Sequence, residues 1–122
     1  MCNSKIIGAN AEKAACIFLQ QQKLKLIAKN FNCKLGEIDL IMREKNTFVF
    51  TEVRMRNNKY YTSGLESITV SKQRKISKTA LFYLQKNHML DKVDTRFDVI
   101  IVDYINNQYQ FNWLKNAFLA LA

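Results

Sequence analysis

The sequence is poor in the residues that build disulfide frameworks, zinc sites and histidine-based active sites. It has no proline, one histidine and three cysteines in 122 residues. Cys2, Cys16 and Cys33 are an odd set without a Cys-x-x-Cys pair, so neither a disulfide framework nor a zinc ribbon is indicated. His88 alone gives little support to a zinc site with two histidines or to a Ser-His-Asp triad. These absences favour a protein of the reducing cytoplasm.

Long apolar runs, linkers and repeats are also missing. The longest apolar run near the N-terminus, residues 14–19, is too short for a signal-peptide core and far too short to span a membrane. No shift in composition marks a domain boundary, and domains cluster at ~100 to 150 residues. We therefore expect one domain over residues 1–122, cytoplasmic, soluble and without a membrane span.

Positive charge is in clear excess. The chain has 19 Lys and Arg against 10 Asp and Glu, which gives a net charge of +9. This balance indicates a negatively charged partner. Nucleic acid fits, an anionic membrane surface fits the charge as well, and a surplus of lysine also serves solubility. Charge therefore predicts a nucleic-acid partner only together with suitable motifs.

The hydrophobic pattern predicts a mixture of helices and strands. Apolar residues recur at helical spacing in some segments and alternate, or form short buried runs, in others. In chain order we expect a helix over residues 8–22, strands over 24–28, 37–43 and 47–55, a helix over 70–88, strands over 97–104 and 108–111, and a closing helix over 113–121. The first and last strands have the character of sheet edges. This α-β-β-β-α-β-β-α order favours an α/β fold with a mixed central sheet and flanking helices.

The second and third predicted strands form a hairpin that carries two acids. If the short connection lets Arg43 pair with Phe48, Asp39 falls opposite Glu52, with Cβ atoms ~4.5 to 5.5 Å apart. Two opposed carboxylates repel, and apolar neighbours strengthen the repulsion by limiting the access of water. A hard cation such as Mg²⁺ offsets it, because one or two carboxylates, waters and a substrate phosphate complete its coordination. The hairpin therefore predicts a metal-binding carboxylate pair.

A structural salt-bridge lattice is the alternative for the same hairpin. The register places Glu37 opposite Arg54, and Glu52 would then pair with Arg43 or Arg56. The strands alone leave both interpretations open.

A third acid favours the metal site. Glu12 precedes Ala15, Cys16 and Leu19 by three, four and seven residues, so it lies within the apolar stripe of the first predicted helix. A carboxylate that faces the sheet is costly unless it is paired or bound to metal. A shift at the start of the helix would instead leave Glu12 exposed.

The hairpin also resembles a known family. Residues 36–41 (GEIDLI) and 49–56 (VFTEVRMR) are similar to the signature of the YraN family of bacterial proteins. That family belongs to the restriction-endonuclease-like superfamily and is similar to archaeal Holliday-junction resolvases. The likeness runs almost end to end and includes Gly8, Glu12, Lys72 and residues 96–100 and 116–118. It implies a restriction-endonuclease-like fold and a metal-dependent endonuclease that hydrolyses phosphodiester bonds in DNA, including branched DNA.

The resemblance also implies roles for individual residues. Asp39, Glu52 and the Val53 carbonyl would hold Mg²⁺ or Mn²⁺, with Glu12 as an accessory acid. Arg54 stands at the position of the superfamily's catalytic lysine. Arginine stays charged where lysine can lose its proton, so Arg54 would orient the attacking water or stabilise the phosphate in the transition state. The alternative is a nucleic-acid-binding module of the same fold that cuts slowly or not at all.

Further candidate residues surround the acids. Glu37, opposite Arg54, completes the candidate catalytic set. Basic side chains would contact the phosphate backbone, and tyrosines would stack on bases or, alternatively, pack on the rim of the sheet. The candidate nucleic-acid contacts are Arg54, Arg56, Lys59, Tyr60, Lys72 and Lys75.

Two more expectations follow from the family resemblance. Asp98 matches a family position at which a strand-end salt bridge with Arg96 is the default interpretation. Related resolvases act as dimers on two strands of DNA, so a homodimer is expected by analogy.

Overall fold

The computed structural model describes residues 4–56 and 68–121, with side chains from Asn10 onward. The elements within these residues are α1 (Ser4–Gln21), β1 (Lys25–Cys33), β2 (Gly36–Glu44), β3 (Thr47–Met55), α2 (Val70–Lys86), β4 (Asp94–Ile105) and β5 (Gln108–Phe118). The strands form one sheet in the order β1-β2-β3-β4-β5, in which β3 and β4 are parallel and the other neighbours antiparallel. The sheet is therefore mixed, and α2 lies in the crossover that a parallel pair requires.

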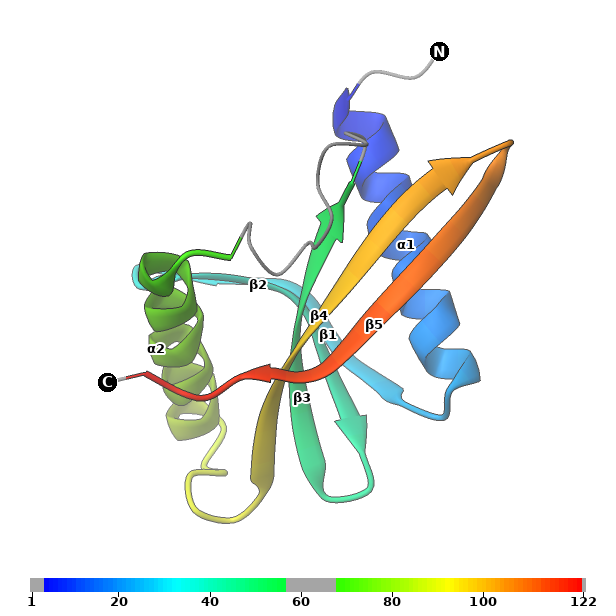
Figure 1. The fold of residues 1–122 in the computed structure, drawn as a ribbon. Coiled ribbons are helices and arrows are strands. Elements are labelled where there is room, and N and C mark those ends of the chain that lie inside the picture. Colours follow the sequence, from blue (N-terminus) through cyan, green and yellow to red (C-terminus); the bar gives the residue numbers. More distant parts are fainter. Residues whose placement is uncertain (1–3, 57–67, 122) are drawn as a thin grey trace.

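The two helices cover opposite faces of the sheet, as Figure 1 shows for α1 and α2. Successive residues of β4 divide between these faces. Val99 and Ile101 pack in the α2 layer, and Ile100 and Val102 pack in the α1 layer. A strand that is buried on both faces has a continuous apolar sequence, which is the pattern found here. The expected α/β fold with a mixed sheet is confirmed, and the arrangement is consistent with a restriction-endonuclease-like fold.

The closing helix predicted over residues 113–121 is wrong. The chain there continues β5 as far as Phe118 and has no helix after it. A bulge explains the misleading pattern, because the register with β4 shifts between Phe118 and Leu114, and Asn116 has a φ of 52°. Trp113 packs in the α1 layer, whereas Leu114 and Phe118 both pack in the α2 layer. The bulge breaks the strict alternation of the strand, so the apolar residues fall at helix-like spacing.

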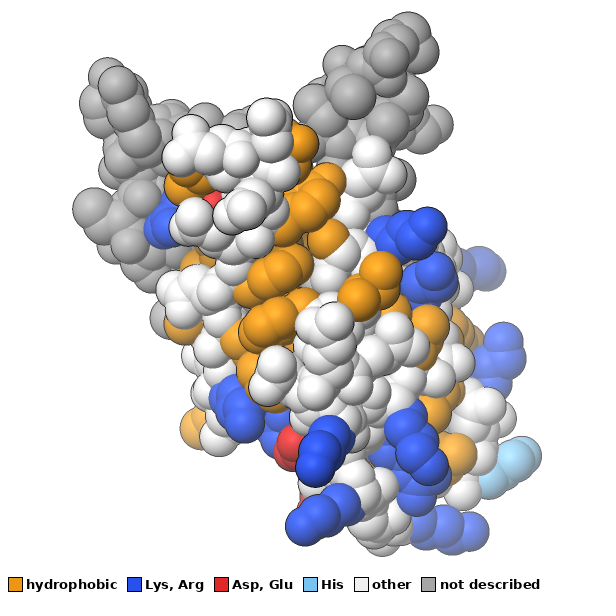
Figure 2. Space-filling view, turned by 90° about the vertical axis from the view of Figure 1, so that its right-hand side faces the viewer, with side chains coloured by type: hydrophobic (Ala, Val, Ile, Leu, Met, Phe, Trp, Pro, Cys, Tyr) orange, Lys and Arg blue, Asp and Glu red, His pale blue; other side chains and the backbone are white. Residues whose placement is uncertain are grey.

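The outer surface at α1 and β5 combines apolar and basic side chains. Figure 2 shows a band of hydrophobic side chains on this side, with Lys and Arg side chains more frequent than acidic ones around it. Part of the apolar surface at α1 and β5 is aromatic, since Phe18 of α1 stacks on Phe111 of β5 with ring centroids 4.6 Å apart. Within residues 4–56 and 68–121, neither helix has the length and apolar character needed to cross a membrane.

The β2–β3 hairpin closes in the predicted register. Arg43 pairs with Phe48, and the ladder continues to Leu40 opposite Thr51, where it ends. Beyond this point β2 stays paired with β1 and runs toward α2, away from β3 (Figure 1). The two strands therefore separate at Asp39 of β2 and Glu52 of β3, and this point is called the fork.

The helix α2 packs closely on the start of β2. A Cβ atom added to Gly36 would lie 3.0 Å from Oγ1 of Thr79, which is closer than side chains normally approach. Ile38 packs in the α2 layer as well. The helix begins after the N-cap Thr69, whose hydroxyl accepts a hydrogen bond from the backbone N–H of Lys72 at 3.1 Å. The small residue at position 36 thus lets α2 approach the forked part of β2.

Candidate active site

Asp39 and Glu52 are the first residues beyond the hairpin ladder, one on each strand. The backbone N–H of Val53 donates to Oδ2 of Asp39 over 2.9 Å, so a side chain takes the place of a ladder partner. The carboxyl group of Glu52 lies close enough to that of Asp39 to raise the pKa of Asp39. The fork therefore brings the two acids together through their side chains, although they are not a ladder pair.

The predicted opposition of Glu37 and Arg54 does not form. Glu37 pairs with Asn32 of β1, and its side chain is exposed. Nη1 of Arg54 lies instead 3.8 Å from Oε2 of Glu52. The fork is the reason, because β2 pairs with β3 only from Leu40 onward and Glu37 lies in the part of β2 that is separated from β3.

Burial and repulsion by Glu52 shift the titration of Asp39. The side chain of Glu52 is almost completely buried, and Asp39 is half-buried. Burial raises the pKa of Asp39 to about 8, and the charge of Glu52, the hydrogen bond to Glu52 and the charge of Glu12 act in the same direction. The hydrogen bond from the Val53 N–H lowers this pKa, because it stabilises the carboxylate. Asp39 therefore holds a proton near neutral pH when no cation is bound.

Glu12 lies near the pair on the α1 side of the sheet. Burial raises the pKa of its carboxyl, the charges of Glu37 and Glu52 raise it further, and Lys29 lowers it. Its half-buried side chain agrees with the predicted sheet-facing position. Among the side chains that the structure describes, no three from His, Cys, Asp and Glu are grouped closely enough to hold a metal ion. A cation at the fork would thus depend on Asp39, Glu52, backbone oxygen, water and substrate.

Two basic side chains lie close to the carboxylate of Glu52. Nζ of Lys72 lies 2.7 Å from Oε2 of Glu52, the same oxygen that Arg54 approaches at 3.8 Å. Lys72 belongs to the first turn of α2, three residues after the N-cap Thr69. The sequence predicted Lys72 only as a phosphate contact, because no local pattern indicates that the start of this helix meets β3. A lysine is therefore present at the acid pair even though residue 54 is arginine.

The salt-bridge alternative is wrong in the partners it assigned to Glu52. Nε of Arg43 donates to the carbonyl oxygen of Lys45 at 2.8 Å. The guanidinium of Arg56 binds both carboxylate oxygens of Asp103, at 3.0 and 2.7 Å. Both arginines therefore have contacts away from the fork, and Arg56 is held there by an ion pair.

A surface pocket of about 380 Å³ lies between the start of β2 and the N-terminal turn of α2. The pocket is lined by Gly36, Glu37, Thr69, Ser71, Lys72, Lys75 and Ile76. The structure thus brings two of the predicted phosphate contacts, Lys72 and Lys75, to one pocket that adjoins the acid pair through Lys72. The predicted contacts Lys59 and Tyr60 lie outside the described residues.

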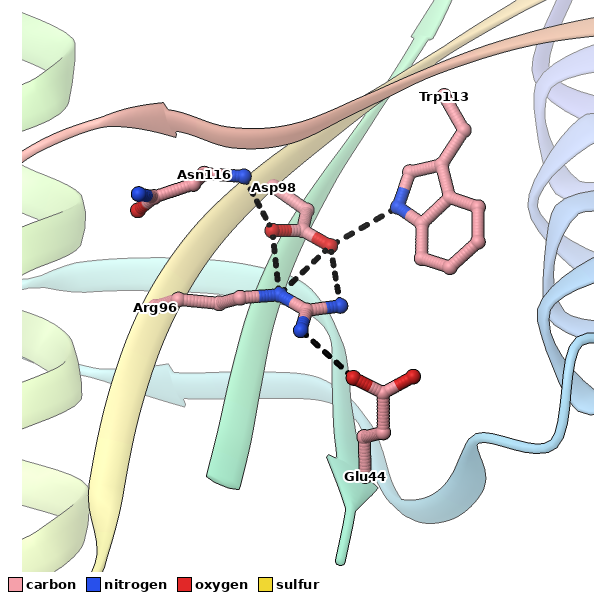
Figure 3. Close-up of polar contacts among 5 residues, drawn as sticks. All are labelled: Glu44, Arg96, Asp98, Trp113 and Asn116. Atoms are coloured by element: carbon pink, nitrogen blue, oxygen red, sulfur yellow. Dashed lines mark hydrogen bonds and ion pairs between the residues drawn. The ribbon is translucent and has the colours of Figure 1, made fainter.

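Asp98 belongs to a separate, structural network (Figure 3). Arg96 donates to it from Nε at 3.0 Å, which confirms the predicted salt bridge, and also binds Glu44 at 2.8 Å. Nε1 of Trp113 and the backbone N–H of Asn116 each donate to Asp98 over 2.9 Å. This fully buried carboxylate therefore ties the bulge of β5 to β4 and, through Arg96, to the end of β2.

Comparison with known proteins gives a family match. Residues 11–102 match the model described as "Uncharacterised protein family UPF0102". The chain is 49% identical to a UPF0102 protein of Coxiella burnetii strain RSA 331 over 111 residues, which cover 91% of this chain and 90% of the relative. It is 47% identical to a UPF0102 protein of Legionella pneumophila strain Philadelphia 1 over 91% of this chain and 92% of the relative. A UPF0102 protein of Nitrosomonas eutropha is 43% identical over 97% of both chains. UPF0102 is the family that the hairpin motifs resemble, and these matches confirm that resemblance.

Proposed function

The chain belongs to the UPF0102 family, and for this member of it we propose a divalent-metal-dependent endonuclease that hydrolyses phosphodiester bonds in DNA. The observation that carries the proposal is the pair of carboxyl groups, Asp39 and Glu52, at the fork of β2 and β3. Glu52 is buried, Asp39 is half-buried with a raised pKa, and basic residues lie next to the pair. A carboxyl group with a strongly shifted pKa beside charged partners marks a candidate functional site, and the adjoining lysine and arginine suit a substrate with phosphate groups.

The donor set at the fork fits a hard divalent cation such as Mg²⁺ or Mn²⁺. Asp39, Glu52 and the Val53 carbonyl would supply oxygen ligands, and Glu12 would act on the site through its charge, which already raises the pKa of Asp39. A cation between the two carboxylates would replace the proton that Asp39 now holds. When bound, the metal would lower the pKa of a coordinated water and neutralise charge on the phosphate.

The chain's own residues would position the phosphate and the attacking water. A guanidinium group does not lose its proton in proteins, so Arg54 would act as a hydrogen-bond donor and an electrostatic partner and not as a general base. Val53 orients Asp39 through its N–H, which is a fixed group of the strand. Lys72 and Lys75 would contact the phosphates next to the reacting one from the pocket at the start of α2.

The finer substrate assignment rests on analogy. Similarity to Holliday-junction resolvases makes branched DNA the first substrate to test, and a homodimer would present one site to each of two strands. Lysine and arginine contacts with phosphate release counterions, so binding should weaken steeply as the salt concentration rises.

The decisive experiment is a cleavage assay with Mg²⁺ or Mn²⁺ on duplex, single-stranded and branched DNA. We expect cleavage by the wild type and its loss in Asp39→Ala and in Glu52→Ala. Asp91→Asn is the matched control, because Asp91 is an exposed acid on the loop before β4. Cleavage that survives both site substitutions would contradict the proposal.

A nucleic-acid-binding module of the same fold is the second candidate, and Arg54 is the observation that favours it. In that case DNA binding would depend on salt, persist in Asp39→Ala and lead to no cleavage with either metal. If Arg54→Lys gained cleavage, the wild type would be identified as a weakened enzyme and not as a binding module.

A further inference from the structure

We infer that Lys72 of α2 takes the catalytic role of the lysine that β3 lacks at residue 54. When a divalent cation binds, Lys72 would leave Glu52 and contact a phosphate of the substrate. The inference rests on the proposed nuclease function. Lys72 is separated from Glu52 by 20 positions in the sequence, and its ammonium nevertheless contacts the carboxylate at 2.7 Å.

The position of Lys72 is well defined by local structure. Its backbone N–H is bound to the hydroxyl of Thr69, so the residue lies in the capped first turn of α2. From there the side chain reaches into the fork, where Glu52 is 7% exposed, while the Lys72 side chain itself is 39% exposed. The ammonium thus lies at the boundary between the enclosed acid pair and solvent, where a phosphate of the substrate would arrive.

Electrostatics explains the exchange of partners. In the chain without a bound metal, Lys72 compensates the charge of Glu52, which is buried beside a second acid. A divalent cation held by Asp39 and Glu52 would take over this compensation and would repel the ammonium at short range. A phosphate is then the natural partner, and a lysine can follow it because its charge is compact and its four-carbon stem is flexible.

The pocket at the start of α2 gives the released ammonium a suitable place. Lys72 and Lys75 line it together, so a phosphate there would be contacted by both. The cation would repel Arg54 as well, but Arg54 belongs to β3, two residues after Glu52, so it would stay near Glu52 Oε2, from which it now lies 3.8 Å away. Arg54 therefore stays next to the two acids, whereas Lys72 moves to the substrate phosphate.

Metal binding without DNA tests the exchange directly. Calorimetric titration with Mn²⁺ at pH 8.5 should show several-fold tighter binding to Lys72→Met than to the wild type, because a competing cation has been removed. Lys78→Met is the matched control, since Lys78 is an exposed lysine of the same helix and its loss changes the net charge equally. The Mn²⁺ affinity of the control should stay within about twofold of the wild-type affinity. Equal or weaker Mn²⁺ binding by Lys72→Met would overturn the inference.

Cleavage at saturating Mn²⁺ tests the second half of the inference. Lys72→Met should cut DNA about 100-fold more slowly, the size of effect expected when one group that stabilises the transition state is removed. Adding Arg54→Lys to Lys72→Met should recover part of the rate, which a merely structural role of Lys72 would not permit. Wild-type cleavage by Lys72→Met, or no recovery in the double variant, would overturn the assignment.

The nuclease function and the competition between Lys72 and the metal can be tested separately. If the wild type cuts no DNA with either metal, the nuclease function and the catalytic assignment of Lys72 fail together. The Mn²⁺ titration still decides whether Lys72 and the metal compete for Glu52, because it requires neither DNA nor turnover.

Discussion

Replacing Asp39 by asparagine should change how the stability of the metal-free protein depends on pH. In the folded chain the pKa of Asp39 is about 8, because of its burial and of the charge of Glu52, against an ordinary value of 3.8. The folded chain therefore holds a proton that the unfolded chain releases from about pH 4 upward. Because the folded pKa is the higher one, this stabilisation is complete below pH 4 and is lost as the pH rises through about 8.

The size of the effect follows from the shift in pKa. A rise from 3.8 to about 8 sets an upper limit of about 6 kcal/mol, since each pKa unit corresponds to ~1.36 kcal/mol. Water and local rearrangement at the half-buried side chain reduce this limit, so we expect the wild type to lose about 2 to 4 kcal/mol between pH 5 and pH 9. Asparagine has the shape of the protonated acid and can still accept from the Val53 N–H. Asp39→Asn should therefore lose most of the pH dependence and exceed the wild type in stability at pH 9.

Urea unfolding at pH 5, 7 and 9 in the presence of EDTA measures these free energies. Asp91→Asn is the control, because Asp91 is exposed and its φ of 63° is a backbone conformation that asparagine also tolerates. Mn²⁺ at pH 8 should stabilise the wild type and leave Asp39→Asn almost unchanged. A wild-type stability that does not fall between pH 5 and pH 9, or an equal fall in Asp39→Asn, would contradict the raised pKa of Asp39.

Three further substitutions test the packing around the site by urea unfolding at constant pH. Asp98→Asn should cost about 3 kcal/mol, because it leaves the Arg96 guanidinium without its buried counter-charge; a loss below 1 kcal/mol would contradict the structural role of this network. Gly36→Ala should destabilise by about 1 to 2 kcal/mol through the contact with Thr79, and the loss should shrink when Thr79→Ala is also present. Thr51→Val should stabilise by about 1 kcal/mol, because the buried Thr51 hydroxyl has no hydrogen-bond partner among the described residues; a destabilised variant would show that the hydroxyl is satisfied.

Local sequence patterns were sufficient to predict the hairpin and most of the helices and strands. The two-residue turn at Lys45 and Asn46 sets the register, and a register once set determines which residues of two strands face each other. The closeness of Asp39 and Glu52 could therefore be predicted, because each lies next to the last ladder pair, Leu40 and Thr51, although the ladder does not include the two acids. The closing helix could not be predicted correctly, since a bulge at Asn116 gives a strand the apolar spacing of a helix.

The family, the α/β fold class, the two central acids and the arginine at residue 54 thus follow from the sequence alone. The assembled fold was needed to show that β2 leaves β3 at Asp39, that Glu37 pairs with β1, and that Lys72 contacts Glu52. The difference lies in the range of the interactions. Turn geometry and side-chain alternation act between neighbours in the chain, whereas the fork and the position of Lys72 depend on how α2 packs across β2. That packing is a property of the assembled core, and it places the lysine beside the acid pair.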